Sequence, residues 1–328
     1  MQSIGVIGGG AWGTALAQVF AKNGRDTTLW AREPEVVNSI RQHHQNSVFL
    51  PGVELSKSLN ATGSLDDIAK KDILVLVSPA QYVRTTLGSL KKDLNDKPVV
   101  ICAKGIEIGT GLLLSQVAEE VAPKAKISIL TGPTFAAEIA RGLPGAVTLA
   151  CKDEKLAKQL QSSLGSKFFR AYVTDDVAGA QVSGAIKNVI AIACGIIHGR
   201  NMGDSARAAL VTRGLAEITR LTVALGGKKE TMLGLCGIGD LMLTCSSMQS
   251  RNFSLGAALG QGKTLDEVLG TRKEVTEGVH TAKATIELAK KLKVEMPITT
   301  AVNKCLNEGL SVDRAIEELL SRPAGVEN

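Results

Sequence analysis

The sequence is poor in aromatic residues and has few histidines and cysteines. Its 328 residues include two tryptophans, two tyrosines, six phenylalanines and four histidines. Proteins that stack nucleic-acid bases need aromatic side chains, so this scarcity argues against nucleic-acid binding. The six cysteines lack Cys-x-x-Cys spacing and the histidines form no metal-ligand pattern, which excludes the common zinc motifs. We therefore expect no metal site and reduced cysteines, as in a cytoplasmic protein.

Long runs of one charge and long uncharged apolar segments are also missing. The 38 Lys and Arg residues exceed the 32 Asp and Glu residues to give a net charge of +6, but the lysine clusters are only doublets. This balance favours small anions over a polyanion as partner. The most apolar stretch, 185–197, contains Lys187, and the first residues lack a basic segment. We expect neither a membrane span nor a signal peptide.

The first half of the chain alternates short apolar strands with helical patterns. This rhythm predicts a doubly wound, mostly parallel α/β sheet. One helix is predicted over 11–22. The predicted strands are 3–7, 27–30, 73–77, 99–103, 127–130, 147–150 and 168–172.

After about residue 175 the strand pattern ends and the chain becomes helical. A long helix is predicted from near Val177 to beyond Ile190. Asp204 and Ser311 are expected to cap two helices, and Thr264 with Glu267 matches a capping box. We therefore predict two domains that share a cleft: a sheet domain, 1–180, and an all-α C-terminal domain, 181–328.

A glycine-rich turn follows the first predicted strand and precedes the first predicted helix. Gly8, Gly10 and Gly13 fit the pattern G-x-G-x-x-G. In this context Gly8 permits a tight turn, Gly10 allows a pyrophosphate to approach the backbone, and Gly13 lets helix and strand pack closely. The sheet domain is therefore expected to be Rossmann-like and to bind a dinucleotide.

The second strand ends without the acidic residue that holds the ribose hydroxyl in most NAD-binding proteins. Arg32 lies there instead and matches a 2′-phosphate, so we hypothesise that NADPH is used and NADH also accepted. Two alternatives to this role of Arg32 stay open. In one, Arg32 is a solvated charge on a loop, and in the other, Glu33 binds the ribose.

Two lysines are candidates for the reaction chemistry. Lys104 follows a strand at the edge where open α/β sheets bind ligands, and it is either a solvated residue or a cation directed into the cleft. Lys187 lies in a helix of small and apolar residues, where Ser183 and Asn188 share its narrow polar stripe. Burial would lower its pKa and suit it to proton transfer. The alternative is a lysine that extends from a core helix to solvent.

A second polar constellation lies further along the chain. Asp240 is flanked by glycines in an apolar segment and is a counter-charge for Lys187 or Lys104. Thr244 follows it by one helical turn. Arg251 and Asn252 offer a guanidinium and an amide suited to a phosphate, although spacing alone equally allows a surface ion pair for Arg251.

These motifs together resemble one family, the bacterial NAD(P)-dependent glycerol-3-phosphate dehydrogenases. The resemblance implies NADPH- or NADH-dependent, reversible reduction of dihydroxyacetone phosphate to sn-glycerol 3-phosphate for glycerophospholipid synthesis in the cytoplasm. It also implies a homodimer. The matching segments are 8–13, 103–105, 132–136, 184–189, 237–241, 249–252, 277–278 and 296–299.

The resemblance assigns a role to each matched position. Lys187 is the proton donor, and Lys104 and Asp240 complete the catalytic group. The substrate contacts are Lys104, Gly132, Thr134, Lys187, Asn188, Asp240, Thr244, Ser250, Arg251 and Asn252. The cofactor contacts are Gly8, Gly10, Ala11, Trp12, Gly13, Arg32, Lys104, Ala136, Arg251, Val275 and Glu277. Ala11 and Trp12 depart from the usual serine and tyrosine or phenylalanine, which affects the expected cofactor affinity and not the reaction type.

Two other functions fit parts of the same pattern. A 3-hydroxyacid or 6-phosphogluconate type dehydrogenase shares the architecture and a helix-borne lysine. There, lysine and asparagine usually lie four residues apart, whereas Lys187 and Asn188 are adjacent here. The other alternative is a nicotinamide-sensing binding protein without turnover, since a fold does not fix a function.

Overall fold

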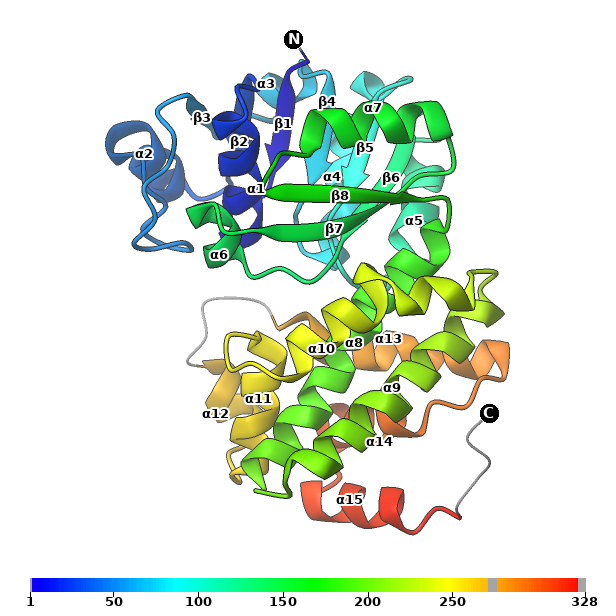
Figure 1. Cartoon of the computed structure of the whole chain (residues 1–328). Helices are drawn as coiled ribbons and strands as arrows, with labels where there is room; N and C mark the ends of the chain where they lie inside the picture. The colour runs from blue at the N-terminus through cyan, green and yellow to red at the C-terminus, as the bar shows by residue number, and fades with distance from the viewer. Residues whose placement is uncertain (1, 271–275, 324–328) are drawn as a thin grey trace.

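The computed structural model describes residues 2–270 and 276–323, and an eight-stranded sheet forms its first half (Figure 1). The strand order is β3-β2-β1-β4-β5-β6-β7-β8. Every neighbouring pair is parallel except β6 and β7. The strands are β1 Ile4–Ile7, β2 Thr27–Trp30, β3 Leu59–Thr62, β4 Ile73–Leu76, β5 Pro98–Ile101, β6 Lys126–Thr131, β7 Gly145–Ala150 and β8 Phe169–Thr174. The predicted doubly wound, mostly parallel sheet is confirmed.

Helices cover both faces of this sheet, and the sheet separates two buried clusters of apolar side chains. The helices of this half are α1 Ala11–Lys22, α2 Pro34–His43, α3 Leu65–Ala69, α4 Val83–Leu90, α5 Leu114–Val121, α6 Ala136–Arg141 and α7 Glu154–Leu164, with short 3₁₀ turns η1 Ala80–Tyr82 and η2 Lys91–Asp93. The sequence prediction missed β3, whose residues Leu-Asn-Ala-Thr hold only one β-branched side chain. Pairing with β2 makes this segment a strand despite its weak propensity.

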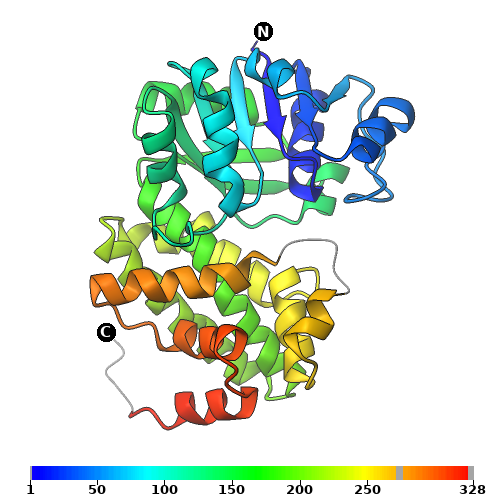
Figure 2. The same cartoon turned by 180° about the vertical axis from the view of Figure 1, so that it is seen from behind.

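The second half is helical, and no strand follows β8 in the described residues (Figure 2). Its elements are α8 Val177–Gly199, α9 Asp204–Ala224, η3 Lys229–Leu233, η4 Leu235–Gly239, α10 Asp240–Cys245, α11 Arg251–Gly260, α12 Leu265–Gly270, α13 Glu277–Leu292, α14 Pro297–Asn307 and α15 Val312–Leu320. The predicted long helix is α8.

Two of the three predicted helix caps are confirmed. The Thr264 hydroxyl accepts from the backbone N–H of Glu267, and the Glu267 carboxylate accepts from the backbone N–H of Thr264. Ser311 caps α15 through the backbone N–H of Arg314. The third prediction is wrong, because Asp204 is the first residue of α9 and the cap position belongs to Gly203. Gly203 has a φ of +91°, a backbone conformation that favours glycine. The Asp204 carboxylate still lies at the positive end of the helix dipole.

Helix α8 is the core of the helical half. It is long and apolar enough to cross a membrane by length and composition, yet the apolar window that meets this test is fully buried inside the protein. Glycines bring α8 and α11 into backbone contact. A Cβ atom on Gly195 would lie 2.0 Å from the carbonyl oxygen of Phe253, and one on Gly256 would lie 2.0 Å from that of Ile192. Part of the high glycine content therefore serves this helix crossing.

The two halves are joined where β8 leads into α8. The buried Asp176 carboxylate caps α8 at the backbone N–H of Gly179 and also accepts from the backbone N–H of Lys228 and the hydroxyl of Thr231. This carboxylate therefore ties η3 to the start of α8. Helix α8 in turn places its polar residues beside the carboxyl ends of β5 and β6.

Candidate active site

Asp240 lies between the two candidate lysines. Its Oδ1 atom is 2.6 Å from the Nζ atom of Lys187, and its Oδ2 atom is 2.9 Å from the Nζ atom of Lys104. The Asp240 side chain is fully buried, while those of Lys187 and Lys104 are 7% and 20% exposed. The sequence proposed Asp240 as partner for one lysine or the other. The structure shows that it binds both.

Each member of this triad comes from a different part of the fold. Lys104 follows β5, Lys187 lies in the middle of α8, and Asp240 is the first residue of α10. The chain reaches Asp240 through a kink at Gly237, where a Cβ atom would lie 2.1 Å from the carbonyl oxygen of Met232. Glycine is therefore needed at position 237 to place the Asp240 carboxylate against the lysines.

Thr244 extends the same network. The Nζ atom of Lys187 donates to the Thr244 hydroxyl over 2.7 Å, and that hydroxyl lies 3.3 Å from the Oδ1 atom of Asp240. Residues four apart on a helix share a face, so α10 presents both groups to α8. The Lys187 ammonium thus has two partners within the protein, and its third N–H is available to a ligand.

The shared carboxylate separates the pKa values of the two lysines. Burial lowers the pKa of Lys187 to about 8, because the attraction of Asp240 offsets desolvation only in part and Lys104 adds repulsion. Burial acts on Lys104 in the same direction, but Asp240 outweighs it, and the pKa of Lys104 lies above its ordinary value. Desolvation favours a neutral Asp240, yet the two ammonium groups hold the pKa of its carboxyl below the ordinary value.

Gly184 allows the sheet and helix sides of the site to approach each other. It lies one turn before Lys187 on α8, and a Cβ atom there would be 2.9 Å from the hydroxyl of Thr131 and 3.8 Å from the Cγ atom of Lys104. Sequence reasoning did not single out Thr131, which ends β6 as Lys104 follows β5. Its signal was present, since both positions lie at the carboxyl ends of adjacent strands.

The glycine turn between β1 and α1 has the geometry expected of a pyrophosphate site. Gly8 has a φ of +127°, and a Cβ atom on Gly13 would lie 1.9 Å from the Gly8 carbonyl oxygen. A Cβ atom on Gly10 would meet nothing within 4 Å, so the backbone there is open to a ligand. No side chain caps α1 and its first turn has no acidic residue. The free N–H groups and helix dipole suit a phosphate.

Four further cofactor candidates lie around this turn. Trp12 packs on Phe169, with ring centroids 6.3 Å apart, while Ala11 and Ala136 begin the neighbouring helices α1 and α6. The Arg32 side chain is 74% exposed just beyond β2, and its guanidinium lies 3.2 Å from the Glu33 carboxylate.

The residues predicted for the phosphate surround the start of α11. Ser250 caps this helix at the backbone N–H of Phe253, and Arg251 is its exposed first residue. The Oδ1 atom of the buried Asn252 accepts from the backbone N–H of Gly278, and the N–H groups of the same amide are the donors that suit a phosphate. Asn252 therefore also links α11 to the start of α13.

Glu277 connects the helical half to the sheet half. Its carboxylate accepts a 3.3 Å hydrogen bond from the backbone N–H of Ala80, which follows β4. Burial raises the pKa of Glu277 in spite of the nearby Arg251 charge. Val275 lies outside the described residues.

Three substrate candidates remain, of which Gly132 and Thr134 follow β6 and Asn188 lies in α8. The Thr134 hydroxyl donates to the Gly132 carbonyl over 3.4 Å, and a Cβ atom on Gly132 would approach Val147 to 2.8 Å. Asn188 is buried beside Lys187 on α8. The structure thus gathers Lys104, Lys187, Asp240 and Thr244 into direct contact, while Gly132, Thr134 and Arg251 are not bonded to that group by any hydrogen bond among the described residues.

Comparison with known proteins agrees with this architecture. Family models match two segments: residues 3–157 match the N-terminal part of NAD-dependent glycerol-3-phosphate dehydrogenase, and residues 176–317 match its C-terminal part.

Similar proteins are found among bacteria. The glycerol-3-phosphate dehydrogenase (NAD(P)+) of Parvibaculum lavamentivorans is 55% identical over 98% of this chain and 97% of its own length. The enzyme of the same name from Rhodospirillum rubrum is 55% identical over 99% of this chain and 93% of its own. The crystal structure of glycerol-3-phosphate dehydrogenase from Coxiella burnetii has 36% identity and a TM-score of 0.94, covering 98% of this chain and 99% of its own.

Proposed function

The chain belongs to the NAD-dependent glycerol-3-phosphate dehydrogenase family, and from this premise we propose how its residues carry out the reaction. It is an NAD(P)-dependent oxidoreductase that reduces dihydroxyacetone phosphate to sn-glycerol 3-phosphate with NADH or NADPH, which supplies glycerophospholipid synthesis. The family membership favours this over the sensor and the 3-hydroxyacid alternatives. The observation that carries the proposed mechanism is the contact of one buried carboxylate with two lysines of opposite pKa shift.

Lys187 is the proton donor in reduction. Its pKa of about 8 lets the ammonium lose a proton near neutral pH, and Asp240 and Thr244 fix its direction. Its third N–H is the donor that we assign to the oxygen of the substrate ketone. When bound, the nicotinamide supplies the hydride to the ketone carbon. Lys187 gives its proton to the resulting oxygen and takes one back in the reverse reaction.

Lys104 acts by charge. Its raised pKa keeps it protonated throughout the working pH range, so it stabilises negative charge that develops on the substrate oxygen. Two titratable groups whose surroundings push their pKa values apart divide the acid and electrostatic roles between them. Asp240 sets this division because it binds both ammonium groups.

The substrate phosphate binds at the start of α11. The N–H groups of this ten-residue helix and the Arg251 side chain face the same anion, and Asn252 and Ser250 hold the helix end in place. Binding energy at the phosphate orients the distant ketone. Dihydroxyacetone without its phosphate is therefore expected to react with a much lower kcat/KM.

The cofactor binds along the glycine turn, which offers an open backbone at Gly10 and an uncapped helix end. Arg32 favours the 2′-phosphate of NADPH, and Glu33 reduces this preference by pairing with it. Arg32→Ala is expected to raise the KM for NADPH and leave that for NADH unchanged. An unchanged NADPH KM would refute this assignment.

Three further proposals concern assembly, location and domains. The homodimer and the cytoplasmic location follow from the family resemblance. The division into domains at residues 1–180 and 181–328 follows from the end of the strand pattern after about residue 175. The cysteines support the location, since all six are free thiols and five of them are buried.

Replacing Lys187 with methionine tests the mechanism. Lys187→Met keeps the length of the side chain and removes the proton, so turnover is expected to fall on the order of 10²–10⁴-fold while NADPH binding, measured by fluorescence, stays intact. Lys92→Met, at an exposed lysine far from the site, serves as the matched control. An active Lys187→Met enzyme would overturn the proposed role.

A further inference from the structure

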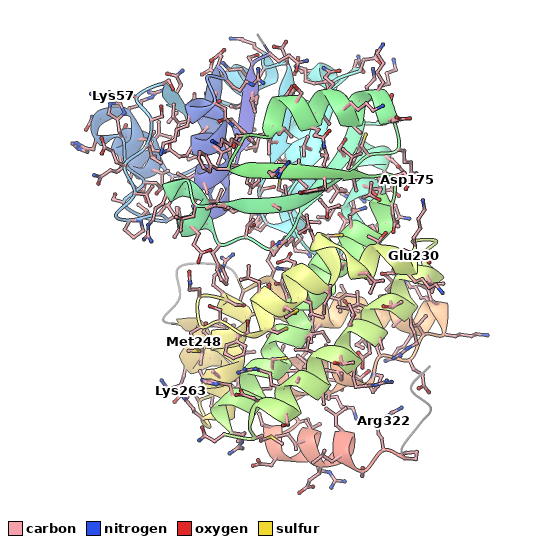
Figure 3. The ribbon with its side chains drawn as sticks, viewed as in Figure 1. Lys57, Asp175, Glu230, Met248, Lys263 and Arg322 are labelled. Carbon is pink, nitrogen blue, oxygen red and sulfur yellow. The ribbon has the colours of Figure 1, made fainter. Side chains whose placement is uncertain are left out.

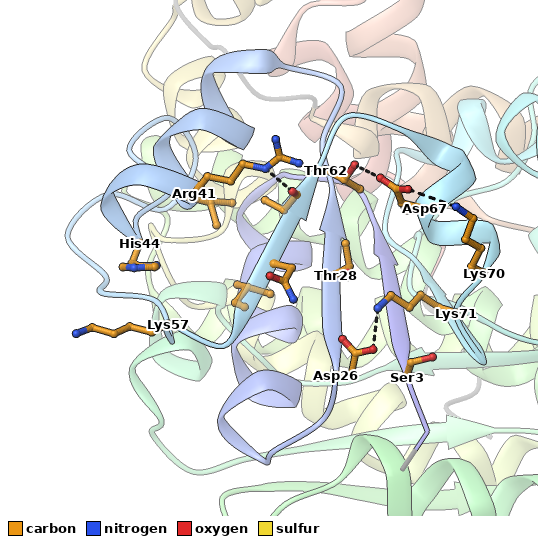
Figure 4. A pocket seen from close by; sticks show the side chains of 14 residues that line it. Ser3, Asp26, Thr28, Arg41, His44, Lys57, Thr62, Asp67, Lys70 and Lys71 are labelled. Atoms are coloured by element: carbon orange, nitrogen blue, oxygen red, sulfur yellow. Dashed lines mark hydrogen bonds and ion pairs between the residues drawn. The ribbon is translucent and has the colours of Figure 1, made fainter.

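A polar depression lies along the outer edge of the sheet, apart from the site described above. Its volume is about 660 Å³, and it opens between α2 and α3 over strands β2 and β3 (Figure 4). Lys57, on its rim, marks the outer edge of the sheet domain away from the helical domain (Figure 3). None of the lysine–aspartate group and none of the glycine-turn residues lines it. We call it the β2–β3 depression, and its lining is Ser3, Asp26, Thr28, Ile40, Arg41, His44, Lys57, Leu59, Asn60, Ala61, Thr62, Asp67, Lys70 and Lys71.

The floor of the β2–β3 depression is polar on one face of strand β3. Thr28 of β2 is paired with Asn60 of β3, and Thr62 lies two residues further along the same strand. Because side chains alternate along a strand, these three share one face, while Leu29 and Leu59 belong to the apolar cluster on the other. Since β3 ends the sheet, no further strand covers this edge. Ile40, Leu59 and Ala61, on the other face, also line the depression, which therefore passes around the edge of the sheet.

The walls carry a positive balance. Arg41 and Lys57 lie on the α2 side, and Lys70 and Lys71 on the α3 side, against the two carboxylates of the depression. Lys71 pairs with Asp26 over 2.9 Å, and Lys70 lies 3.8 Å from Asp67. The two cations of the α2 side have no ion pair within the described residues. The positive balance of the depression therefore lies on that side.

Arg41 is held in a position to bind an anion. Its Nε atom donates to the backbone carbonyl of Ala61 over 2.8 Å, which fixes the guanidinium beside the edge strand (Figure 4). The two terminal nitrogens make no hydrogen bond to other described residues. A guanidinium fixed at one nitrogen and open at the other two presents the paired donors that match a phosphate.

We propose that the β2–β3 depression is a second binding site, which takes a small phosphorylated molecule with several hydroxyl groups. The Arg41 guanidinium binds the phosphate. Hydroxyl groups bind to Asp26, whose carboxylate accepts hydrogen bonds, and to Asn60, whose amide both accepts and donates them. The volume suits a single small molecule. This assignment is independent of the catalytic mechanism, because the depression shares no residue with it.

The test uses isothermal titration calorimetry on the full-length protein saturated with NADPH, with ribose 5-phosphate as probe. An Arg251→Ala background removes binding at the catalytic phosphate site. The probe is expected to bind this protein, and Arg41→Gln and Asn60→Asp are expected to weaken it about tenfold each, as expected for the loss of a charge-assisted hydrogen bond and the gain of a repelling charge. Lys92→Glu, outside the depression, is the control and should change nothing.

Asn60→Asp keeps the test informative if Arg41→Gln unfolds the protein, since the exposed Asn60 side chain makes no hydrogen bond to other described residues. The proposal is overturned if the probe fails to bind at millimolar concentration, or if its binding is unchanged in Asn60→Asp. Equal binding of inorganic phosphate would contradict the role given to the hydroxyl groups. Catalytic activity of Asn60→Asp should equal that of the parent protein.

Discussion

Removal of the Lys104 charge is expected to raise the pKa of Lys187. In the native site Lys104 repels Lys187, and this repulsion adds to burial in bringing the pKa of Lys187 to about 8. In Lys104→Gln the repulsion is gone, whereas Asp240 still attracts the remaining ammonium from 2.6 Å. The loss of repulsion and the remaining attraction both favour the ammonium form, so Lys187 holds its proton to a higher pH.

The size of the effect follows from the shared carboxylate. Two ammonium groups bound to the two oxygens of one carboxylate lie close together, and at an effective dielectric constant of about 20 they repel by about 3 kcal/mol. Since about 1.4 kcal/mol corresponds to a tenfold change in proton affinity, loss of Lys104 increases the proton affinity of Lys187 on the order of 100-fold.

The assay is the pH dependence of kcat/KM for dihydroxyacetone phosphate at saturating NADPH, followed by nicotinamide absorbance. Reduction needs protonated Lys187, so kcat/KM is constant below its pKa and falls above it. The midpoint of this fall, about 8 in the parent protein, should rise by about two pH units in Lys104→Gln. The plateau will also be lower because a stabilising charge is lost.

The midpoint and not the plateau tests the reasoning. Lys92→Gln, at an exposed lysine, should leave both unchanged. In the oxidation direction the neutral lysine is needed, so the rising limb of that profile should move upward by the same amount. A midpoint in Lys104→Gln that stays at the parent value or falls would show that Lys104 does not set the pKa of Lys187.

Three further predictions concern packing and thiol chemistry. Gly195→Ala places a Cβ atom 2.0 Å from the Phe253 carbonyl oxygen, so urea unfolding should show that the free energy of unfolding falls by roughly 1–3 kcal/mol. In the control Gly88→Ala the Cβ atom meets Val121 at 3.7 Å, and this change should be neutral or stabilising. Equal effects of the two substitutions would contradict the backbone contact. Gly13→Ala should weaken NADPH binding more than it lowers unfolding stability, because its Cβ atom would push against Gly8 at 1.9 Å and distort the turn; unchanged NADPH affinity would oppose this. Five of the six free cysteines are buried, and burial raises the thiol pKa of several, so a thiol reagent should react slowly with the native protein and rapidly with all six in urea; fast native labelling of more than one would be inconsistent.

Local patterns in the sequence were sufficient for much of the fold. The glycine turn could be predicted because its three glycines lie within one short segment. The strand before it and the helix after it also have local sequence patterns. The capping box at Thr264 and the cap at Ser311 are likewise local, and both were found. Strand β3 was missed because its pairing with β2, and not its own composition, makes it a strand.

The site divides in the same way. The sequence alone marked Lys187 as unusual, since a lysine in an apolar helix has few explanations, and it identified Asp240 as a carboxylate in need of a counter-charge. It left open which lysine that was. Asp240 lies 53 residues from Lys187 and 136 from Lys104 along the chain, and no local pattern spans such separations.

The sequence by itself determined the fold class, the dinucleotide turn and the set of residues available for the chemistry. Only the tertiary structure decided how they act together. The kink at Gly237 and the small residue at Gly184 bring β5, α8 and α10 close enough for one carboxylate to bind two lysines. The pKa of a lysine depends on its burial and on every charge nearby, so the difference between Lys187 and Lys104 exists only once the chain has folded.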